Sequence, residues 1–119
     1  MIVEKEDIKD KVLKALADNY SKLIILSTID RAKSVLELCK EHNIPIATAY
    51  RKVKELQDLG LLVVERIALT EDGKKFDLYR SAIKVVRITF ESKDVKVEII
   101  PNEDLAGKLS RLWLQIKGR

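Results

Sequence analysis

The chain has 119 residues, enough for one domain with its own hydrophobic core. Its single cysteine excludes an intrachain disulfide, and residues 1–10 are charged where a signal peptide would be apolar, so we expect a cytoplasmic protein. The longest purely apolar runs are four residues, at 23–26 and 61–64. A membrane-spanning helix needs about 20, so we expect no membrane association.

Composition also argues against cofactor, metal and catalytic chemistry. The four glycines, at positions 60, 73, 107 and 118, match neither GxGxxG nor a Walker A loop. One histidine and one cysteine are too few for a Cys/His zinc site within one chain. No nucleophile, histidine or metal constellation suggests an active site. We therefore expect a binding protein that needs no cofactor and is not an enzyme.

The distribution of charge is more informative than its sum. The chain has 23 Lys and Arg against 19 Asp and Glu, a net charge of +4 that does not by itself indicate a polyanionic partner. Residues 34–82 carry 8 basic and 8 acidic side chains, whereas residues 83–119 carry 8 and 5. Within the balanced segment, residues 44–54 contain three basic side chains and no acidic one.

Two helices are expected in the first 30 residues. Apolar residues at helical spacing place the first at about 5–18, namely Ile8, Val12, Leu13 and Leu16. Asn19 or Ser21 is expected to cap the second, whose apolar residues extend to Ile29 and fill more than one face. This second helix should therefore be central to the core.

Residues 34–60 predict two more helices joined by a tight turn. Ser34 stands three residues before Glu37, the spacing of a capping box that opens a helix ending near His42. Asn43 is suited to the left-handed conformation of a tight helix exit. The next helix, at 45–59, begins at a proline and is ended by Gly60; its apolar side is Ile46, Ala49, Val53 and Leu56.

Strand character follows. Residues 61–69 are rich in Leu, Val and Ile, residues 70–75 form a turn with Gly73 at positive φ, and residues 76–79 return as a second strand. Apolar and polar residues alternate at 86–91 and 95–99, which predicts a hairpin with its turn at 92–94. Pro101 should stop it, and Asn102 should cap a final amphipathic helix whose apolar stripe is Leu105, Leu109, Leu112, Trp113 and Ile116.

This order of elements, with the local sequence LCKEHNI followed by PIATAYRKVKELQDLGLL, resembles archaeal winged helix-turn-helix transcriptional regulators of the broad ArsR/MarR-like kind over residues 34–80. The places taken by a small residue, a turn glycine and a branched apolar residue in such motifs correspond here to Cys39, Asn43 and Ile44. The expected fold class is α+β, mainly α: a winged helix-turn-helix with a C-terminal β-hairpin and amphipathic helix. Residues 1–80 would form the DNA-binding part, with its wing at about 61–80, and residues 81–119 an extension of the same domain for dimerisation or signal response.

The resemblance implies a recognition helix at 45–59 that enters the major groove of double-stranded DNA while the wing contacts flanking phosphates. Taking Ala49 as the inward direction, Ala47, Arg51, Lys54 and Asp58 point outward, with Thr48 and Tyr50 on the flanks. Arg66 and Arg80 on the wing strands are expected to help the wing reach flanking phosphates or the minor groove. The predicted DNA contacts are Ile46, Ala47, Thr48, Tyr50, Arg51, Lys52, Lys54, Arg66, Lys74 and Lys75. For the basic residues the alternative is a solvated surface, and for Tyr50 it is packing against the preceding helix.

Cys39 and His42 share a helix face, but the paired cysteines or clustered ligands of a metal sensor are absent. We expect Cys39 to be a small buried residue at a helix crossing, and His42 to be partly buried and hydrogen-bonded.

A homodimer is expected, because two recognition helices about 34 Å apart would match successive major grooves. Its candidate interface residues are Ile8, Val12, Leu16, Leu105, Leu109, Leu112, Trp113 and Ile116. A small-molecule effector between the C-terminal hairpin and the final helix is left open. The alternative function is a winged-helix protein-interaction module in a transcription or replication assembly, which the balanced charge of residues 34–82 favours.

Overall fold

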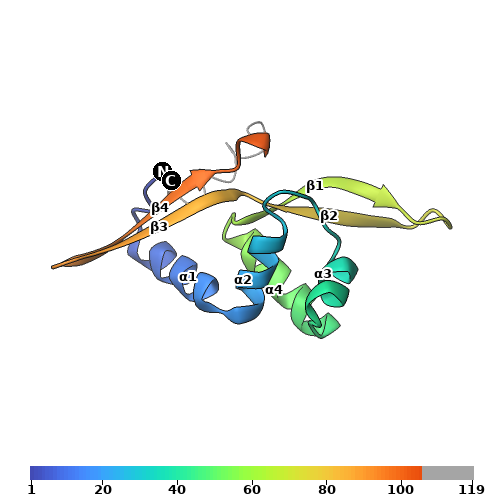
Figure 1. Cartoon of the computed structure of the whole chain (residues 1–119), viewed down its shortest axis with the longest axis horizontal. Coiled ribbons are helices and arrows are strands. Elements are labelled where there is room, and N and C mark those ends of the chain that lie inside the picture. Colours follow the sequence, from blue (N-terminus) through green and yellow to red (C-terminus); the bar gives the residue numbers. More distant parts are fainter. Residues whose placement is uncertain (106–119) are drawn as a thin grey trace.

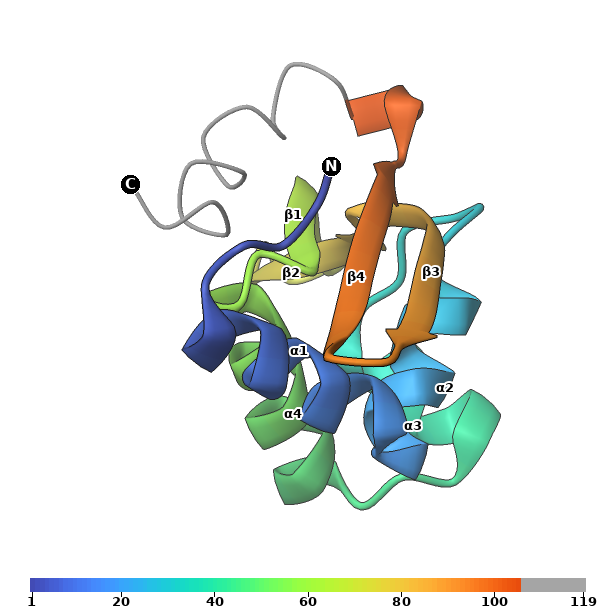
Figure 2. The ribbon, with the colours of Figure 1, turned by 90° about the vertical axis from the view of Figure 1, so that its left-hand side faces the viewer.

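The computed structural model describes residues 1–105 and shows an α+β fold, with helices in one layer and hairpins in the other (Figure 1, Figure 2). The expected α+β class is thus confirmed. In this part of the chain the elements, in order, are α1 (Glu6–Ala17), α2 (Asn19–Ser27), α3 (Val35–His42), α4 (Ile46–Asp58), β1 (Leu62–Leu69), β2 (Lys75–Ser81), β3 (Ile83–Glu91), β4 (Asp94–Pro101) and the short 3-10 helix η1 (Glu103–Leu105).

Local capping chemistry explains most helix ends. The predicted capping box is confirmed: Ser34 Oγ accepts from the Glu37 backbone N–H, and the Glu37 carboxylate accepts from the Ser34 N–H, both at 3.1 Å. Asn43 has the predicted left-handed conformation, with φ at 54°. The prediction for α2 was wrong by one residue, because Asp18 is its N-cap and accepts from the Ser21 N–H at 2.9 Å.

Helix α4 matches its predicted boundaries closely, but one of its apolar residues does not face the core. Ala49, Val53 and Leu56 are buried as expected. Ile46, placed on the same side by periodicity, is 56% exposed. The core instead takes Ile44, which precedes the helix. The first turn of α4 therefore presents a large apolar side chain to the surface.

Both hairpins form, and they project from opposite ends of the helical layer (Figure 1). Strands β1 and β2 pair antiparallel with a bulge between Val64 and Arg66. Their turn holds Gly73 at φ 84°, as predicted. Strand β2 is longer than predicted, and Tyr79 exchanges two backbone hydrogen bonds of 2.8 and 2.9 Å with Lys33, in the segment that precedes α3.

Strands β3 and β4 pair as the predicted second hairpin, with a shorter turn than expected. Asp94 already belongs to β4 and pairs with Glu91, so residues 92–93 alone form the turn. On the outer side of β4, the Val3 N–H donates to the Val97 carbonyl at 2.9 Å. Lys9 Nζ on α1 lies 2.9 Å from the Asp94 carboxylate, which ties the first helix to the end of this hairpin.

Most buried apolar residues of the helices and of both hairpins form one cluster. Leu38, Leu56, Leu61 and Val97 are fully buried in it. Val12 belongs to the same cluster and is 0% exposed. Val12 therefore cannot contact a second copy in this structure, which corrects its assignment to a dimer interface, since α1 turns it toward the chain's own core.

The other expected dimer residues divide between two groups. Leu105 is buried with Val63 and Ala82, so its assignment is corrected for the same reason. Ile8 and Leu16 are half-buried against the main core. Leu109, Leu112, Trp113 and Ile116 lie outside the described residues, as does nearly all of the predicted final helix. Asn102 does accept from the Asp104 N–H, at 3.4 Å, at the start of that segment.

Candidate nucleic-acid interface

The outer face of helix α4 carries the predicted basic residues. The side chains of Arg51 and Lys54 are exposed, and each pairs with a carboxylate four residues on: Arg51 with Glu55 at 3.6 Å and Lys54 with Asp58 at 3.5 Å. Exposed pairs of this kind contribute only about 0.3–0.5 kcal/mol. Both cations therefore remain available to a more strongly charged partner such as a phosphate backbone.

Lys52 occupies a different place from the one predicted. Its side chain is only 14% exposed, and Nζ lies 3.2 Å from Asp18 Oδ1 and 3.7 Å from Glu55 Oε2. One residue along a helix is a rotation of about 100°, which turns Lys52 from the outer face toward the start of α2. The Ser21 N–H and then Lys52 lower the pKa of Asp18. Lys52 therefore links α4 to the start of α2, and its prediction as a DNA contact is corrected.

The β1–β2 hairpin presents the other predicted cations. Lys74 and Lys75 are exposed and form no ion pair with any residue in 1–105. Glu71 and Asp72 lie in the same turn, so the charge of the tip is balanced. Arg66 is exposed and pairs with Glu65 at 2.7 Å. The turn itself is closed by the Lys74 N–H, which donates to Thr70 Oγ1 at 3.0 Å.

A cavity that the sequence analysis missed lies between the start of α3, helix α4 and strand β2. Its volume is about 430 Å³, and Leu36, Tyr50, Phe76, Tyr79 and Lys75 are among its lining residues. Burial, followed by the neighbouring Asp77, raises the pKa of Tyr79. This cavity could not be predicted from the sequence, because its walls come from three separate segments. It brings predicted contacts of α4 and of the wing, Tyr50 and Lys75, to one place.

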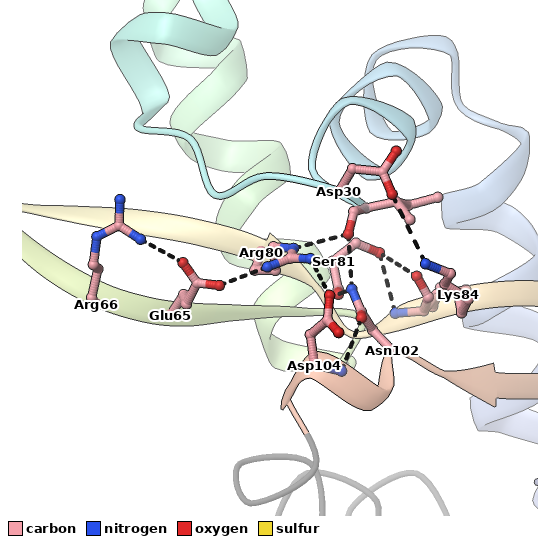
Figure 3. Close-up of polar contacts among 10 residues, drawn as sticks. Asp30, Glu65, Arg66, Arg80, Ser81, Lys84, Asn102 and Asp104 are labelled. Carbon is pink, nitrogen blue, oxygen red and sulfur yellow. Dashed lines mark hydrogen bonds and ion pairs between the residues drawn. The ribbon is translucent and has the colours of Figure 1, made fainter.

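Arg80 lies at the base of the β1–β2 hairpin and is not available to DNA (Figure 3). It is 7% exposed, although it was expected on the wing surface. Its Nη1 donates to Glu65 at 2.7 Å, its Nη2 to Asp104 at 2.8 Å, and its Nε to the Ile29 carbonyl at 2.9 Å. A buried guanidinium needs such partners, which explains why the side chain turns inward.

Asn102 completes this network and links it to the chain's last described segment (Figure 3). It is 0% exposed, and its side-chain amide donates to the Ile29 carbonyl at 2.9 Å and to the Ser81 carbonyl at 3.1 Å. Arg80 and Asn102 thus share the Ile29 carbonyl just after α2. The sequence predicted Asn102 only as a helix cap, because its long-range partners are 21 and 73 residues away.

Cys39 and His42 are both half-buried residues of α3. Cys39 is half-buried against the core, less enclosed than predicted. His42 is half-buried as expected, but its buried Nε2 has no hydrogen-bond partner; Glu41 Oε2 is 3.7 Å away. In residues 1–105 no group of three His, Cys, Asp or Glu side chains is arranged to hold a metal ion.

A second cavity, of about 570 Å³, separates α1 from the C-terminal half of α4 and has mixed charge, with Lys11, Lys14, Asp18 and Glu55 in its lining. It does not correspond to the effector site considered above, half of which would lie outside the described residues. None of the helices in residues 1–105 is long and apolar enough to cross a bilayer.

Comparison with models of known protein families finds no match, and comparison with curated proteins finds no similar sequence.

Proposed function

We propose that this protein is a winged helix-turn-helix DNA-binding regulator of transcription, with α4 as the recognition helix and the β1–β2 hairpin as the wing. The observation that carries the proposal is the joint placement of α4 and the wing: Tyr50 and Lys75 line one cavity, and Arg51 and Lys54 are exposed on the outer face of α4. Helix α3, the turn at Asn43 and α4 form the helix-turn-helix, and the Lys33–Tyr79 bridge holds the wing against the start of α3.

The mechanism is electrostatic positioning followed by base contact. Lys74 and Lys75 on the wing, with Lys54 on α4, would contact phosphates and set the orientation of the protein. The N-terminal half of α4 would enter the major groove, where Arg51 can donate two hydrogen bonds to a guanine. Occupation of promoter DNA would then exclude or recruit the transcription machinery.

The decisive experiment is selection of bound fragments from genomic DNA, followed by fluorescence anisotropy with the selected duplex and with random duplex. Arg51→Ala should weaken binding to the selected duplex about 10-fold or more, since a bidentate base contact contributes about 1–3 kcal/mol. The matched control is Arg87→Ala. Arg87 is 62% exposed against 59% for Arg51 and pairs with Glu98 at 3.7 Å, but it lies on the opposite hairpin. Equal binding by both variants would refute the assignment of α4.

A second candidate function, a protein-interaction module, is favoured by one observation. Several large apolar side chains are exposed around the same cavity and on the wing: Leu36, Ile46, Tyr50, Ile67, Leu69 and Phe76. Clustered exposed apolar residues are typical of protein interfaces. A module of this kind would show no saturable, sequence-dependent complex in the anisotropy experiment.

We also propose that the protein acts as a homodimer, with Ile8, Leu16 and the apolar stripe of residues 109–116 as candidate contacts. Two copies would present two recognition helices to successive major grooves and double the number of phosphate contacts. Light scattering at several concentrations tests this directly.

A further inference from the structure

The first turns of α4 present an apolar surface where a DNA reader would normally present polar groups. Ile46 is 56% exposed and Tyr50 54% exposed. They are four residues apart on the helix, so their side chains are neighbours on one face. Ala47, Thr48 and Ala49 lie between them in the sequence. Adjacent exposed apolar side chains at a candidate site favour a ligand that has apolar groups.

The same segment has almost no capacity for hydrogen-bonded base reading. Residues 46–50 contain no Arg, Lys, Asn, Gln, Asp or Glu, the side chains that recognise guanine, adenine or cytosine most specifically, and their hydrogen-bonding side chains are limited to the hydroxyls of Thr48 and Tyr50. The nearest basic residues are Arg51, which is outward, and Lys52, which is held by Asp18. In the major groove, the base-edge group that aliphatic and aromatic side chains contact is the C5 methyl of thymine.

The charge beside the strip favours DNA over an apolar protein surface as its occupant. The apolar strip is bordered by three cations and one carboxylate: Arg51 and Lys54 follow it on α4, and Lys75 and Asp77 line the same cavity as Tyr50. No carboxylate occurs in residues 44–54. A ligand that places methyl groups against Ile46 and negative charges against Lys54 and Lys75 satisfies both features.

We propose that Ile46 and Tyr50 read thymine methyl groups, so that the DNA bound by this protein has A·T-rich half-sites with thymines facing α4. The proposal rests on the proposed function and names the class of sequence that the site prefers. Arg51 then supplies at most one guanine contact, at the edge of a half-site that is read mainly by shape complementarity to methyl groups.

Replacement of thymine by uracil tests the proposal, because uracil keeps every hydrogen-bonding group and lacks only the methyl. The selected duplex is compared with the same duplex synthesised with deoxyuridine throughout each half-site. Burial of one methyl or methylene group corresponds to about fourfold in affinity. Two or three contacted methyl groups should therefore make the uracil duplex about 16- to 64-fold weaker for the wild-type protein.

Variants of the strip separate methyl contact from effects of uracil on DNA shape. Ile46→Ser and, independently, Tyr50→Ser should each reduce the discrimination between thymine and uracil duplexes by about fourfold or more. Both residues are exposed, so the fold should be kept, which circular dichroism checks. Phe90→Ser is the control: Phe90 is 80% exposed but lies on the opposite hairpin, and this variant should discriminate as the wild type does.

The outcomes distinguish the two proposals. Saturable, sequence-dependent binding with equal affinity for thymine and uracil duplexes would overturn the methyl-reading inference and leave the DNA-binding function standing. Discrimination that survives unchanged in both Ile46→Ser and Tyr50→Ser would also overturn it. Absence of any saturable complex with genomic DNA would overturn the proposed function itself.

Discussion

Asp18 shows how one side chain at a helix boundary serves two helices. One carboxylate oxygen caps α2 through the Ser21 N–H, and the other lies 3.2 Å from Lys52 on α4. The hydrogen bond from Ser21 and the charge of Lys52 lower the pKa of the carboxyl group. Asp18 therefore stabilises the folded chain in its ionised form.

The first prediction concerns this residue. Asp18→Ala should lower the free energy of unfolding by about 1 kcal/mol at pH 7, the usual cost of losing an N-cap. Because the folded pKa is below the unfolded one, the contribution is present above the ordinary aspartate pKa of 3.8 and is lost as pH falls through the folded pKa. Urea denaturation at pH 7 and near pH 3 should show the gap between wild type and variant narrowing at acidic pH. Asp10→Ala, an exposed change on α1, is the control. A gap independent of pH would contradict the role of the ionised carboxylate.

The second prediction concerns Glu65, which pairs with one exposed arginine and one buried arginine. Arg80 is buried and bonded to three acceptors, whereas Arg66 is exposed. Arg80→Leu should destabilise the protein by about 2 kcal/mol, because the charged hydrogen bonds from Arg80 to Glu65 and to the Ile29 carbonyl are lost. Arg66→Leu should change stability by less than about 1 kcal/mol. Chemical denaturation of both variants measures the difference; similar losses would show that burial of the Arg80 network contributes little.

At the scale of elements, α4 divides its lysines between two tasks. Lys52 faces the start of α2, and Lys54 is exposed on the outer face. DNA binding should therefore depend on Lys54 and not on Lys52. The sequence does not distinguish these two lysines, because both lie in the segment 44–54 that has no acidic residue.

The third prediction follows from this division. Lys54→Ala should lower the slope of log affinity against log salt concentration by about 0.9, the contribution of one phosphate contact on duplex DNA. Lys52→Ala should leave that slope unchanged and reduce thermal stability instead. Anisotropy titrations between low and physiological salt measure both slopes. A change of slope in Lys52→Ala would place this lysine in the interface after all.

The boundaries of the elements were largely predictable, since they depend on neighbouring residues. The Ser34–Glu37 box, the left-handed Asn43 and the turn at Gly73 are set within a few positions of the chain. The predictions failed where contacts with residues of other elements determine a cap or the burial of a side chain. Asp18 takes the cap of α2 while it also binds Lys52, and Ile44 enters the core whereas Ile46 is exposed.

At the scale of the whole molecule, the base of the wing is joined to the last described segment. Arg80 binds Asp104, Asn102 binds the Ser81 and Ile29 carbonyls, and Leu105 packs with Val63 and Ala82. The segment that leads into the proposed dimer stripe is thus anchored at the root of the proposed wing.

The fourth prediction concerns the proposed dimer. Insertion of 5 base pairs between the two half-sites of the selected DNA should abolish two-site binding, because it rotates the second half-site to the far side of the duplex. Insertion of 10 or 11 base pairs, about one helical turn, should restore part of the affinity. Anisotropy with the spacing series measures this. Insensitivity to spacing, together with a monomer in light scattering, would contradict the dimer.

The sequence alone determined the α+β class, the order of the elements and the local chemistry of their ends, because periodicity and capping act over a few residues. It also indicated the outward face of α4. Only the tertiary structure decided which cations remain accessible: Lys52 and Arg80 are held by residues from other elements, and Arg51, Lys54 and Lys75 are not buried. The physical reason is that burial of a charge depends on partners far apart in the chain. The same holds for the cavity beside Tyr50, which three separate segments enclose.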